Sequence, residues 1–350
     1  MIERIFYECV DVTKPSGGVR RLYRHVEILN RHGFAASILH QSHGFRADWF
    51  VSDAPVTAWE PPFELSPRDV LVIPEGHVEV LAATADAPCC RVVIALNWAN
   101  IYRRLPIGTD WRHYGIRHVI AGSLCEQDFI ARTMGLDSVV IASGTNGDLF
   151  RPLGPKRLQI AYMPRKNPDV FTIIAGIFRS RWPRWAHVPF VPIDEVSHAG
   201  VAALLAESAI FLATSFPEGL ARPPLEAMAS GCLVVGFAGR GSLEYMDHGR
   251  NCFRADDLDV LSAAEFLDEA LSQWTDGRAE PMVRAARETA ERYSLAREEQ
   301  AVVDYWRAFR TAHEANDGPC GVPAPTERTI AAPASAAAPA STAAAGGGRP

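Results

Sequence analysis

Two glutamates in the stretch SFPEGLARPPLEAMASG are the residues whose types and spacing best suit chemistry. Glu218 and Glu226 have seven residues between them, the first in an expected loop and the second on the helix that follows. Gly219 precedes that helix, whose N-terminus offers unpaired backbone N–H groups and a dipole that favours an anion. Carboxylates at such a place accept hydrogen bonds from sugar hydroxyls while the amides hold a phosphate. The alternative is that Glu218 caps the helix and Glu226 is a solvated helix residue.

The longer stretch 215–253 resembles the donor-binding segment of the retaining GT-B glycosyltransferases of family 4, also called glycosyl transferases group 1. That segment reads S-x-x-E-G, then P-x-x-E-A-M-A-x-G, then a strand of V-V type. The matching residues are Ser215, Glu218, Gly219, Pro223, Glu226, Ala227, Met228, Ala229, Gly231, Val234 and Val235. The resemblance implies that Glu218 contacts the donor sugar and Glu226 the ribose. It also implies that the amides around Gly219 and Leu220 lie along the donor.

Two cations, Arg165 and Lys166, follow the expected strand Leu158–Tyr162. In the family that the sequence resembles, an Arg and a Lys at this point neutralise the donor diphosphate. Fixed cations are needed because the leaving nucleoside diphosphate gains negative charge as the glycosidic bond breaks. Family members space the two further apart, so the adjacent pair leaves open whether both reach the phosphate. The alternative is a solvated loop.

The glycine pair Gly17–Gly18 follows the first expected strand and opens the first helix. In the family, a GG at this turn lets the backbone approach the donor phosphate or the acceptor, although glycine after a strand is also ordinary turn chemistry. The pattern N-G-D-x-F-x-P, from Asn146 to Pro152, resembles the family's connection between domains. The resemblance extends over residues 1–310.

Many relatives carry a histidine after an N-domain strand, close to the transferred sugar, and this sequence lacks it. The equivalent turn is Leu96-Asn97-Trp98, where Asn97 could still bond a sugar hydroxyl. His77, after the expected strand Asp69–Ile73, is another cleft candidate, although a histidine at a strand end is often incidental. The candidate catalytic residues are therefore Glu218, Asn97 and His77. Retaining transfer by front-face attack needs no strongly basic residue, so the missing histidine does not exclude activity.

Two stretches mix basic and aromatic residues. In 179–185, three arginines alternate with Trp182 and Trp185, a mixture that suits stacking on sugars or contact with anionic lipid headgroups. The alternative is an ordinary loop whose tryptophans cover the edge of the core. The stretch 98–118 follows an N-domain strand, and its position suits a site for a lipid-linked or polymeric acceptor.

No other chemistry competes with this interpretation. The sequence has no GxSxG, HExxH or GxxxxGK[ST] motif. His40 and His43 lack a third ligand at metal spacing, so we expect no metal site. The glycine-rich stretch 236–241 does not match GxGxxG, which argues against an NAD-dependent enzyme. We expect no cofactor, because the nucleotide sugar is a substrate.

Composition and charge set outer limits on function. The 350 residues are 48% hydrophobic and 22% charged, as in ordinary globular chains, and their formal net charge is -6. An acidic chain argues against a general nucleic-acid binder, which needs a basic surface to displace counterions. No stretch is long and apolar enough to span a membrane, and the N-terminus does not read as a signal peptide. Seven scattered cysteines predict no disulfide framework and favour a cytoplasmic setting, with the inner face of the membrane as the open alternative.

Short apolar runs alternate with helical patterns along most of the chain, which predicts parallel sheets covered by helices on both faces. We expect an α/β protein with two Rossmann-like, doubly wound domains facing a cleft, the GT-B arrangement, with a shortened C-terminal domain. The first domain, 1–153, would bind the acceptor and the second, 154–295, the nucleotide sugar. By analogy with relatives, the helix 296–316 returns to the N-terminal domain. The Ala/Pro/Gly-rich tail 317–350 is expected to be disordered.

These features predict a glycosyltransferase that moves a sugar from a nucleotide-diphosphate sugar to an acceptor hydroxyl with retention. The expected setting is the synthesis of surface polysaccharide or glycolipid. The expected partners are the nucleotide sugar and a glycan or lipid-linked acceptor, with peripheral membrane contact left open. The alternative is a non-catalytic GT-B-like protein that binds or scaffolds within a glycan assembly system.

Overall fold

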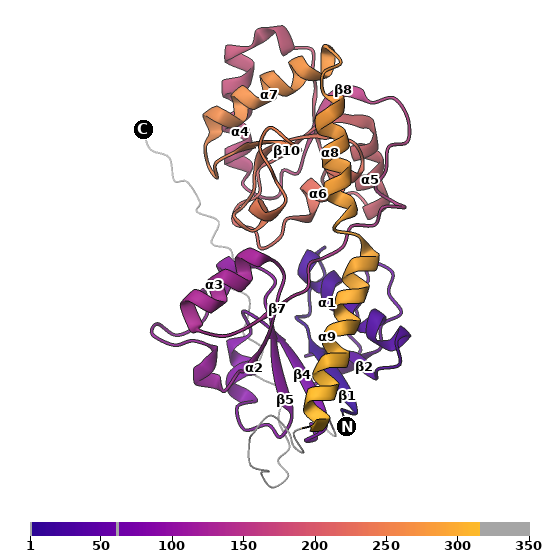
Figure 1. The fold of residues 1–350 in the computed structure, drawn as a ribbon, viewed down its shortest axis with the longest axis vertical. Helices are drawn as coiled ribbons and strands as arrows, with labels where there is room; N and C mark the ends of the chain where they lie inside the picture. Colours follow the sequence, from indigo (N-terminus) through magenta and orange to yellow (C-terminus); the bar gives the residue numbers. More distant parts are fainter. Residues whose placement is uncertain (1, 61–62, 316–350) are drawn as a thin grey trace, which may run out of the picture.

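The computed structural model describes residues 2–60 and 63–315, and within them it contains two parallel sheets, each with its own helices (Figure 1). We call the part built on the first sheet the N-terminal lobe and the part built on the second the C-terminal lobe. The predicted α/β class with two Rossmann-like units in a GT-B arrangement is confirmed. The expected tail 317–350, and residue 316 before it, lie outside the described residues.

The N-terminal lobe is built on a seven-stranded sheet in the order β3-β2-β1-β4-β5-β6-β7, and every adjacent pair is parallel. Its strands are β1 (Arg4–Glu8), β2 (Ala36–His40), β3 (Val56–Ala58), β4 (Asp69–Pro74), β5 (Cys90–Ile94), β6 (His118–Ala121) and β7 (Val139–Val140). Strands β4 and β5 are buried along their whole length. Continuous burial explains their unbroken apolar sequences, since both faces of a doubly wound sheet are covered.

The C-terminal lobe has a smaller sheet of five parallel strands in the order β12-β11-β10-β8-β9. Its strands are β8 (Arg157–Tyr162), β9 (Phe190–Pro192), β10 (Ser208–Ala213), β11 (Leu233–Phe237) and β12 (Phe253–Ala255). The chain passes from helix α4 to β9 through one short turn of 3-10 helix, η3 (Pro183–Trp185), without another strand. This direct passage is why the second sheet is the smaller one.

Helices cover both faces of each sheet. The α-helices are α1 (Gly17–Arg31), α2 (Val78–Ala83), α3 (Leu124–Met134), α4 (Pro168–Arg181), α5 (His198–Glu207), α6 (Arg222–Ala229), α7 (Val260–Thr275), α8 (Glu280–Glu291) and α9 (Leu295–Ala315), and the other 3-10 helices are η1 (Trp98–Asn100), η2 (Trp111–Tyr114) and η4 (Gly241–Glu244). Alternation along the strands sends neighbouring side chains to opposite cores: Tyr7 packs with α1 and α9, while Phe6 packs into the cluster that contains residues of α2 and α3. None of the described helices has the length and apolar character to cross a membrane.

The chain crosses between the lobes twice, and the two crossings are bonded to each other. The backbone N–H of Thr145 donates to the carbonyl of Tyr293 at 2.6 Å. Gly144 is required at this crossing, because a methyl group on it would lie 2.6 Å from the carbonyl oxygen of Ser294. Beyond this point α9 lies against α1 of the N-terminal lobe, so that α8 and α9 run along both lobes (Figure 1).

The arginine–tryptophan stretch 179–185 is engaged inside the C-terminal lobe. The indole N–H of Trp185 and the guanidinium of Arg184 both donate to Asp268 of α7, at 2.6 and 2.5 Å. Arg181 pairs with Glu265 of the same helix at 3.3 Å. These contacts favour the alternative in which the stretch covers the edge of the core, over stacking on sugars or contact with lipid.

Candidate functional site

The segment with the two glutamates follows β10, a strand whose six residues are all buried. The loop leads to α6, which begins at Arg222 with Pro223 and Pro224 in its first turn, where the missing N–H of proline costs no hydrogen bond. The backbone N–H of Glu218 donates to Gly239 at 2.9 Å, so this loop is bonded to the loop that follows β11. Gly219 precedes the helix by three residues, and the N-cap position is occupied by Ala221.

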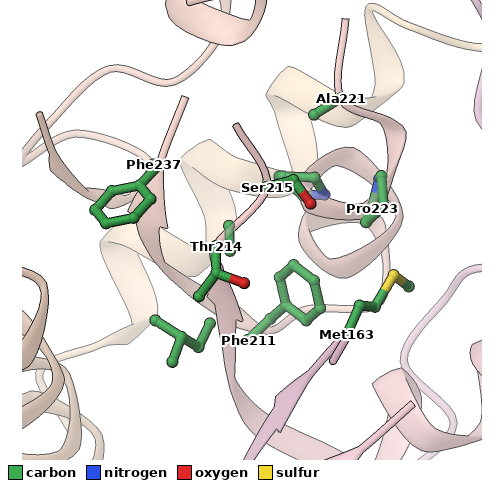
Figure 2. Close-up of a pocket in the computed structure, with 10 residues that line it drawn as sticks. Met163, Phe211, Thr214, Ser215, Ala221, Pro223 and Phe237 are labelled. Atoms are coloured by element: carbon green, nitrogen blue, oxygen red, sulfur yellow. The ribbon is translucent and has the colours of Figure 1, made fainter. Parts of the chain in front are cut away.

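Apolar side chains hold the base of this loop against the end of the sheet. Figure 2 shows Met163, Phe211, Thr214, Ser215 and Pro223 around a cavity of about 10 Å³. That space holds at most about one water molecule. The loop is therefore packed down on the carboxyl ends of β8 and β10, which limits the positions that Glu218 can adopt.

Glu218 and Lys166 form an ion pair between Oε1 and Nζ. The Glu218 side chain is 12% exposed, whereas that of Lys166 is 47% exposed. Asn167, which sequence analysis missed, joins the two loops: its Nδ2 donates to the carbonyls of Thr214 and Phe216, both at 2.9 Å. Asn167 has a φ of 53°, a left-handed conformation that asparagine tolerates better than most residues. The Asn-Pro pair that opens α4 was the available sequence signal.

Arg165 points away from Lys166 and reaches the other lobe. Its Nη1 donates to the carbonyl of Pro15 at 2.8 Å, just before Gly17 and Gly18 at the start of α1. The adjacent pair of cations therefore has two different partners, and the structure brings only Lys166 to Glu218. Gly18 packs close to Leu96, since a methyl group on it would lie 3.0 Å from that side chain.

Glu226 is buried on α6, with 8% of its surface exposed. Its Oε1 lies 3.5 Å from Nε2 of His198, the first residue of α5. A cavity of about 200 Å³ adjoins this pair, lined by both lobes. Leu220, between the two glutamates, packs against the core of the C-terminal lobe.

In the N-terminal lobe, Asn97 and Trp98 bond the backbone of the loop 214–221 between β10 and α6. We call this loop, which contains Glu218, the donor loop. Nδ2 of Asn97 donates to the carbonyl of Pro217 at 3.2 Å, and its Oδ1 accepts from the N–H of Ala99 at 3.0 Å. The indole N–H of Trp98 donates to the carbonyl of Glu218 at 2.9 Å. Both polar atoms of Asn97 are therefore engaged, and in this arrangement it joins the lobes instead of facing a sugar.

His77, the residue before α2, pairs through Nδ1 with Glu8 at the end of β1. Glu8 is fully buried, and its Oε1 has no hydrogen-bond partner within the described residues. Burial by itself lowers the pKa of His77, but the charge and hydrogen bond of Glu8 raise it above its ordinary value overall. Within the described residues, no hydrogen bond or ion pair joins His77 to Glu218 or Lys166.

Glu126 of α3 is a buried acid that sequence analysis also missed. Its Oε2 accepts from the N–H of Gly122, and its Oε1 faces Gly219 without a partner in the described chain. Burial raises the pKa of Glu126 to about 8, although the charge of Arg21 opposes the shift. The pattern S-x-x-E from Ser123 to Glu126 was a capping signal, and Ser123 does cap α3.

Comparison with known proteins places part of the chain in a family. Residues 166–273 match the model for glycosyl transferases group 1, and the match includes Lys166, Glu218 and Glu226. This segment is similar to the glycosyl transferases group 1 domain. The sequence is also similar to an alpha-1,6-glucosyltransferase of Actinobacillus pleuropneumoniae serotype 7 (strain AP76), with 31% identity over 165 residues. That alignment covers 44% of this chain and 48% of the relative, so the chain spans about half the length of the curated relative it matches.

Solved structures of similar shape extend over most of the chain. A glycosyltransferase of Rickettsia africae ESF-5 has a TM-score of 0.63 at 16% identity and covers 90% of this chain and 99% of its own. Anabaena Alr3699/HepE, solved with UDP-glucose, has a TM-score of 0.62 at 16% identity and covers 87% and 99%. Sucrose-phosphate synthase of Thermosynechococcus elongatus has a TM-score of 0.68 at 13% identity and covers 89% and 100%. The chain that carries the group 1 domain has the GT-B fold.

Within the described residues, no group of three or more His, Cys, Asp or Glu side chains is placed to hold a metal ion.

Proposed function

We propose that this chain is a retaining glycosyltransferase of family 4 that moves a sugar from a nucleotide-diphosphate sugar to an acceptor hydroxyl. The observation that carries the proposal is the pairing of Lys166 with Glu218 at the carboxyl end of the C-terminal sheet. In a nucleotide sugar the anomeric carbon is bonded directly to the diphosphate. A site for it therefore needs a cation beside a hydrogen-bond acceptor for hydroxyls, and these two residues supply that combination.

In the proposed reaction the acceptor hydroxyl attacks the anomeric carbon from the face that the diphosphate leaves. The bond from that carbon to the phosphate oxygen breaks, the bond to the acceptor oxygen forms, and the acceptor proton passes to the departing phosphate. Lys166 stabilises the developing negative charge, and Glu218 holds the sugar hydroxyls. The reaction uses no histidine base, and we expect no essential metal because protein cations supply the positive charge.

Glucose and uridine are the first donor components to test. The curated relative is named as a glucosyltransferase, and the Anabaena structure contains UDP-glucose. For the acceptor, we propose a glycan or lipid-linked glycan made on the cytoplasmic side of a membrane, during synthesis of surface polysaccharide or glycolipid. Trp98, the first residue of the stretch 98–118, lies beside the donor loop, because its indole N–H donates to the carbonyl of Glu218.

The test is donor turnover by the full chain. Thermal-shift screening with UDP-, GDP- and ADP-glucose identifies the donor, because a ligand that binds only the folded state raises the melting temperature. We expect Lys166→Ala and Glu218→Ala to lower donor hydrolysis or transfer by about 100-fold or more, since each removes a fixed group that acts on the transition state. Glu288→Ala, an exposed position on α8, is the matched control. Full turnover in both site variants contradicts the proposed roles.

The alternative function is that of a non-catalytic GT-B-like binding or scaffold protein. It is favoured by the engagement of Asn97 with Pro217 and of His77 with Glu8, which leaves both predicted residues bonded to protein groups. The two functions differ in one outcome. Tight binding of a nucleotide with no turnover on any acceptor supports the scaffold, and turnover that is lost in Glu218→Ala excludes it.

A further inference from the structure

The cavity of about 200 Å³ between the lobes is unusually rich in arginine. Its walls come from α1, α5, α6 and α9 and from the crossing near Ser143. The charged residues that line it are Arg20, Arg21, Arg24, Glu27, Arg222, Glu226 and Glu298, together with His198. This volume is smaller than the several hundred Å³ of a pocket that encloses a whole drug-sized ligand. It suits part of a larger molecule.

The acids of the cavity are already engaged. Glu298 pairs with Arg24 at 2.7 Å, Glu27 accepts from the hydroxyl of Ser52, and Glu226 lies 3.5 Å from Nε2 of His198. Two arginines are left over: among the described residues, neither Arg20 nor Arg222 forms an ion pair with an acid. Arg20 has one side-chain hydrogen bond, at 3.2 Å to Nδ1 of His198.

These two guanidinium groups are half-buried and close enough to repel each other. Burial and then the charge of Arg222 lower the pKa of Arg20, while the charges of Glu226 and Glu27 oppose part of the shift. Arg222 also lies against the start of α1, because a methyl group on Gly17 would lie 2.9 Å from its Nη2. The N-terminus of a helix carries a partial positive charge, so the guanidinium lies where a cation is unfavourable unless an anion joins it.

Arg21 adds an independent observation. Its side chain is buried, with 6% of the residue exposed, and its Nε has no hydrogen-bond partner within the described residues. Its Nη2 donates to the carbonyl of Ile141, which holds the side chain in the cavity wall. Three arginines that form no ion pair within the described residues therefore meet at one cavity, although the charges of Glu126 and Glu298 act on Arg21 from further away.

We propose that Arg20 and Arg222, one from each lobe, bind the phosphate groups of the nucleoside diphosphate that is released from the donor. This inference rests on the proposed function, and the family resemblance assigns the ribose of the donor to Glu226 on the same wall. An anion between the two arginines relieves their repulsion and bonds both lobes at once, so that the bound nucleotide holds the cleft closed. Sequence comparison pointed to Arg165 and Lys166 alone, and Arg165 is bonded to the backbone of Pro15.

The experiment is calorimetric titration of the full chain with UDP, GDP and ADP. We expect Arg20→Gln and Arg222→Gln each to weaken binding of the preferred diphosphate by about tenfold or more, the usual effect of losing a hydrogen bond to a charged group. Arg222→Lys should keep part of the affinity, because the charge remains while the planar fork is lost. Arg132→Gln, at an exposed position on α3, is the matched control and should bind as the wild type does.

One result would overturn the assignment of the two arginines, and a different result would overturn the proposed function itself. If the wild type binds a diphosphate and both glutamine variants bind it equally well, the assignment of Arg20 and Arg222 is wrong and the proposed function stands. If the wild type binds none of the three diphosphates, the proposed function fails, and the ligand named for this cavity fails with it. The melting temperature without ligand, measured for each variant, separates lost binding from lost folding.

Discussion

Glu126, a buried acid of the N-terminal lobe, lies directly against Gly219 in the donor loop. Its Oε1 faces Gly219 so closely that a methyl group on that glycine would lie 2.1 Å from the oxygen. The contact leaves no room for a side chain at Gly219, and it explains a glycine at this position without a left-handed conformation. Because burial raises the pKa of Glu126 to about 8, the acid is mostly protonated and neutral at pH 7.

We predict that Glu126→Gln makes stability less dependent on pH. Between the unfolded pKa of about 4.5 and the folded value of about 8, the folded chain holds a proton that the unfolded chain has lost. The wild type therefore loses stability relative to the variant as pH rises through this range, and the difference is constant above it. Urea unfolding at pH 5, 6, 7, 8 and 9 measures the effect. Parallel stability curves for the two proteins would show that Glu126 ionises normally, and Glu288→Gln is the exposed control.

At the scale of elements, α9 belongs to the N-terminal lobe although it ends the described chain. Trp306 is fully buried, and its indole N–H donates to the hydroxyl of Tyr7 on β1 at 3.0 Å. Val302 and Val303 lie in the same core, and Glu298 at the start of the helix pairs with Arg24 of α1 at 2.7 Å. The last helix therefore completes the core of the first sheet.

We predict that Trp306→Ala destabilises the chain by about 3–5 kcal/mol, the usual result of removing a large aromatic side chain from a core. Trp306→Phe should lose less, because most of the apolar contact remains while the bond to Tyr7 is lost. Denaturant unfolding with Arg307→Ala as the exposed control on the same helix measures both. A loss below about 1 kcal/mol for the alanine variant would mean that α9 is not part of this core.

On the scale of the whole molecule, the lobes are joined by the double crossing where Thr145 bonds Tyr293 and by several contacts across the cleft. Among the cleft contacts are the hydrogen bonds of Asn97 and Trp98 to the donor loop. The guanidinium of Arg240 also lies 5.1 Å from the centre of the Trp98 ring, a cation–π contact across the lobes. The double crossing is part of the chain's own path, whereas the contacts across the cleft can separate.

We predict that Trp98→Ala opens the cleft in the absence of ligand. Its radius of gyration should exceed that of the wild type, for which a compact chain of this length gives roughly 20 Å. Small-angle X-ray scattering measures the change, and addition of the preferred nucleoside diphosphate should reverse part of it. Trp182→Ala, within the C-terminal lobe, is the control. Identical scattering of Trp98→Ala and the wild type would show that this contact does not hold the lobes together.

The elements that sequence reasoning located correctly are those with long, continuous patterns. The expected strand Asp69–Ile73 coincides with β4, which is buried along its whole length, and the expected strand Leu158–Tyr162 lies within β8. The missed elements are short. Strands β3 and β12 have three residues each and α2 has six, too few for a period to appear.

The residues of the candidate site also divide into those that local sequence patterns predict and those that only the tertiary structure brings together. Glu218, Glu226 and Lys166 were predicted as site residues because they lie at fixed distances within one motif or directly after one strand, and the structure brings Lys166 to Glu218. The arginines of the cavity between the lobes were not predicted from the sequence. Arg20 and Arg222 are separated by about two hundred residues, and only the docking of one lobe on the other makes them neighbours.

The sequence by itself therefore determined the α/β class, the strands that carry the site and the carboxylates of the donor loop, because those depend on periodicity and on local spacing. Only the tertiary structure decided which polar groups are available to a ligand. It engages Asn97 with Pro217 and His77 with Glu8, and among the described residues it places no acid in an ion pair with Arg20 or Arg222. Pairing and burial depend on groups far apart in the chain, and their energies are set by the packing of the lobes.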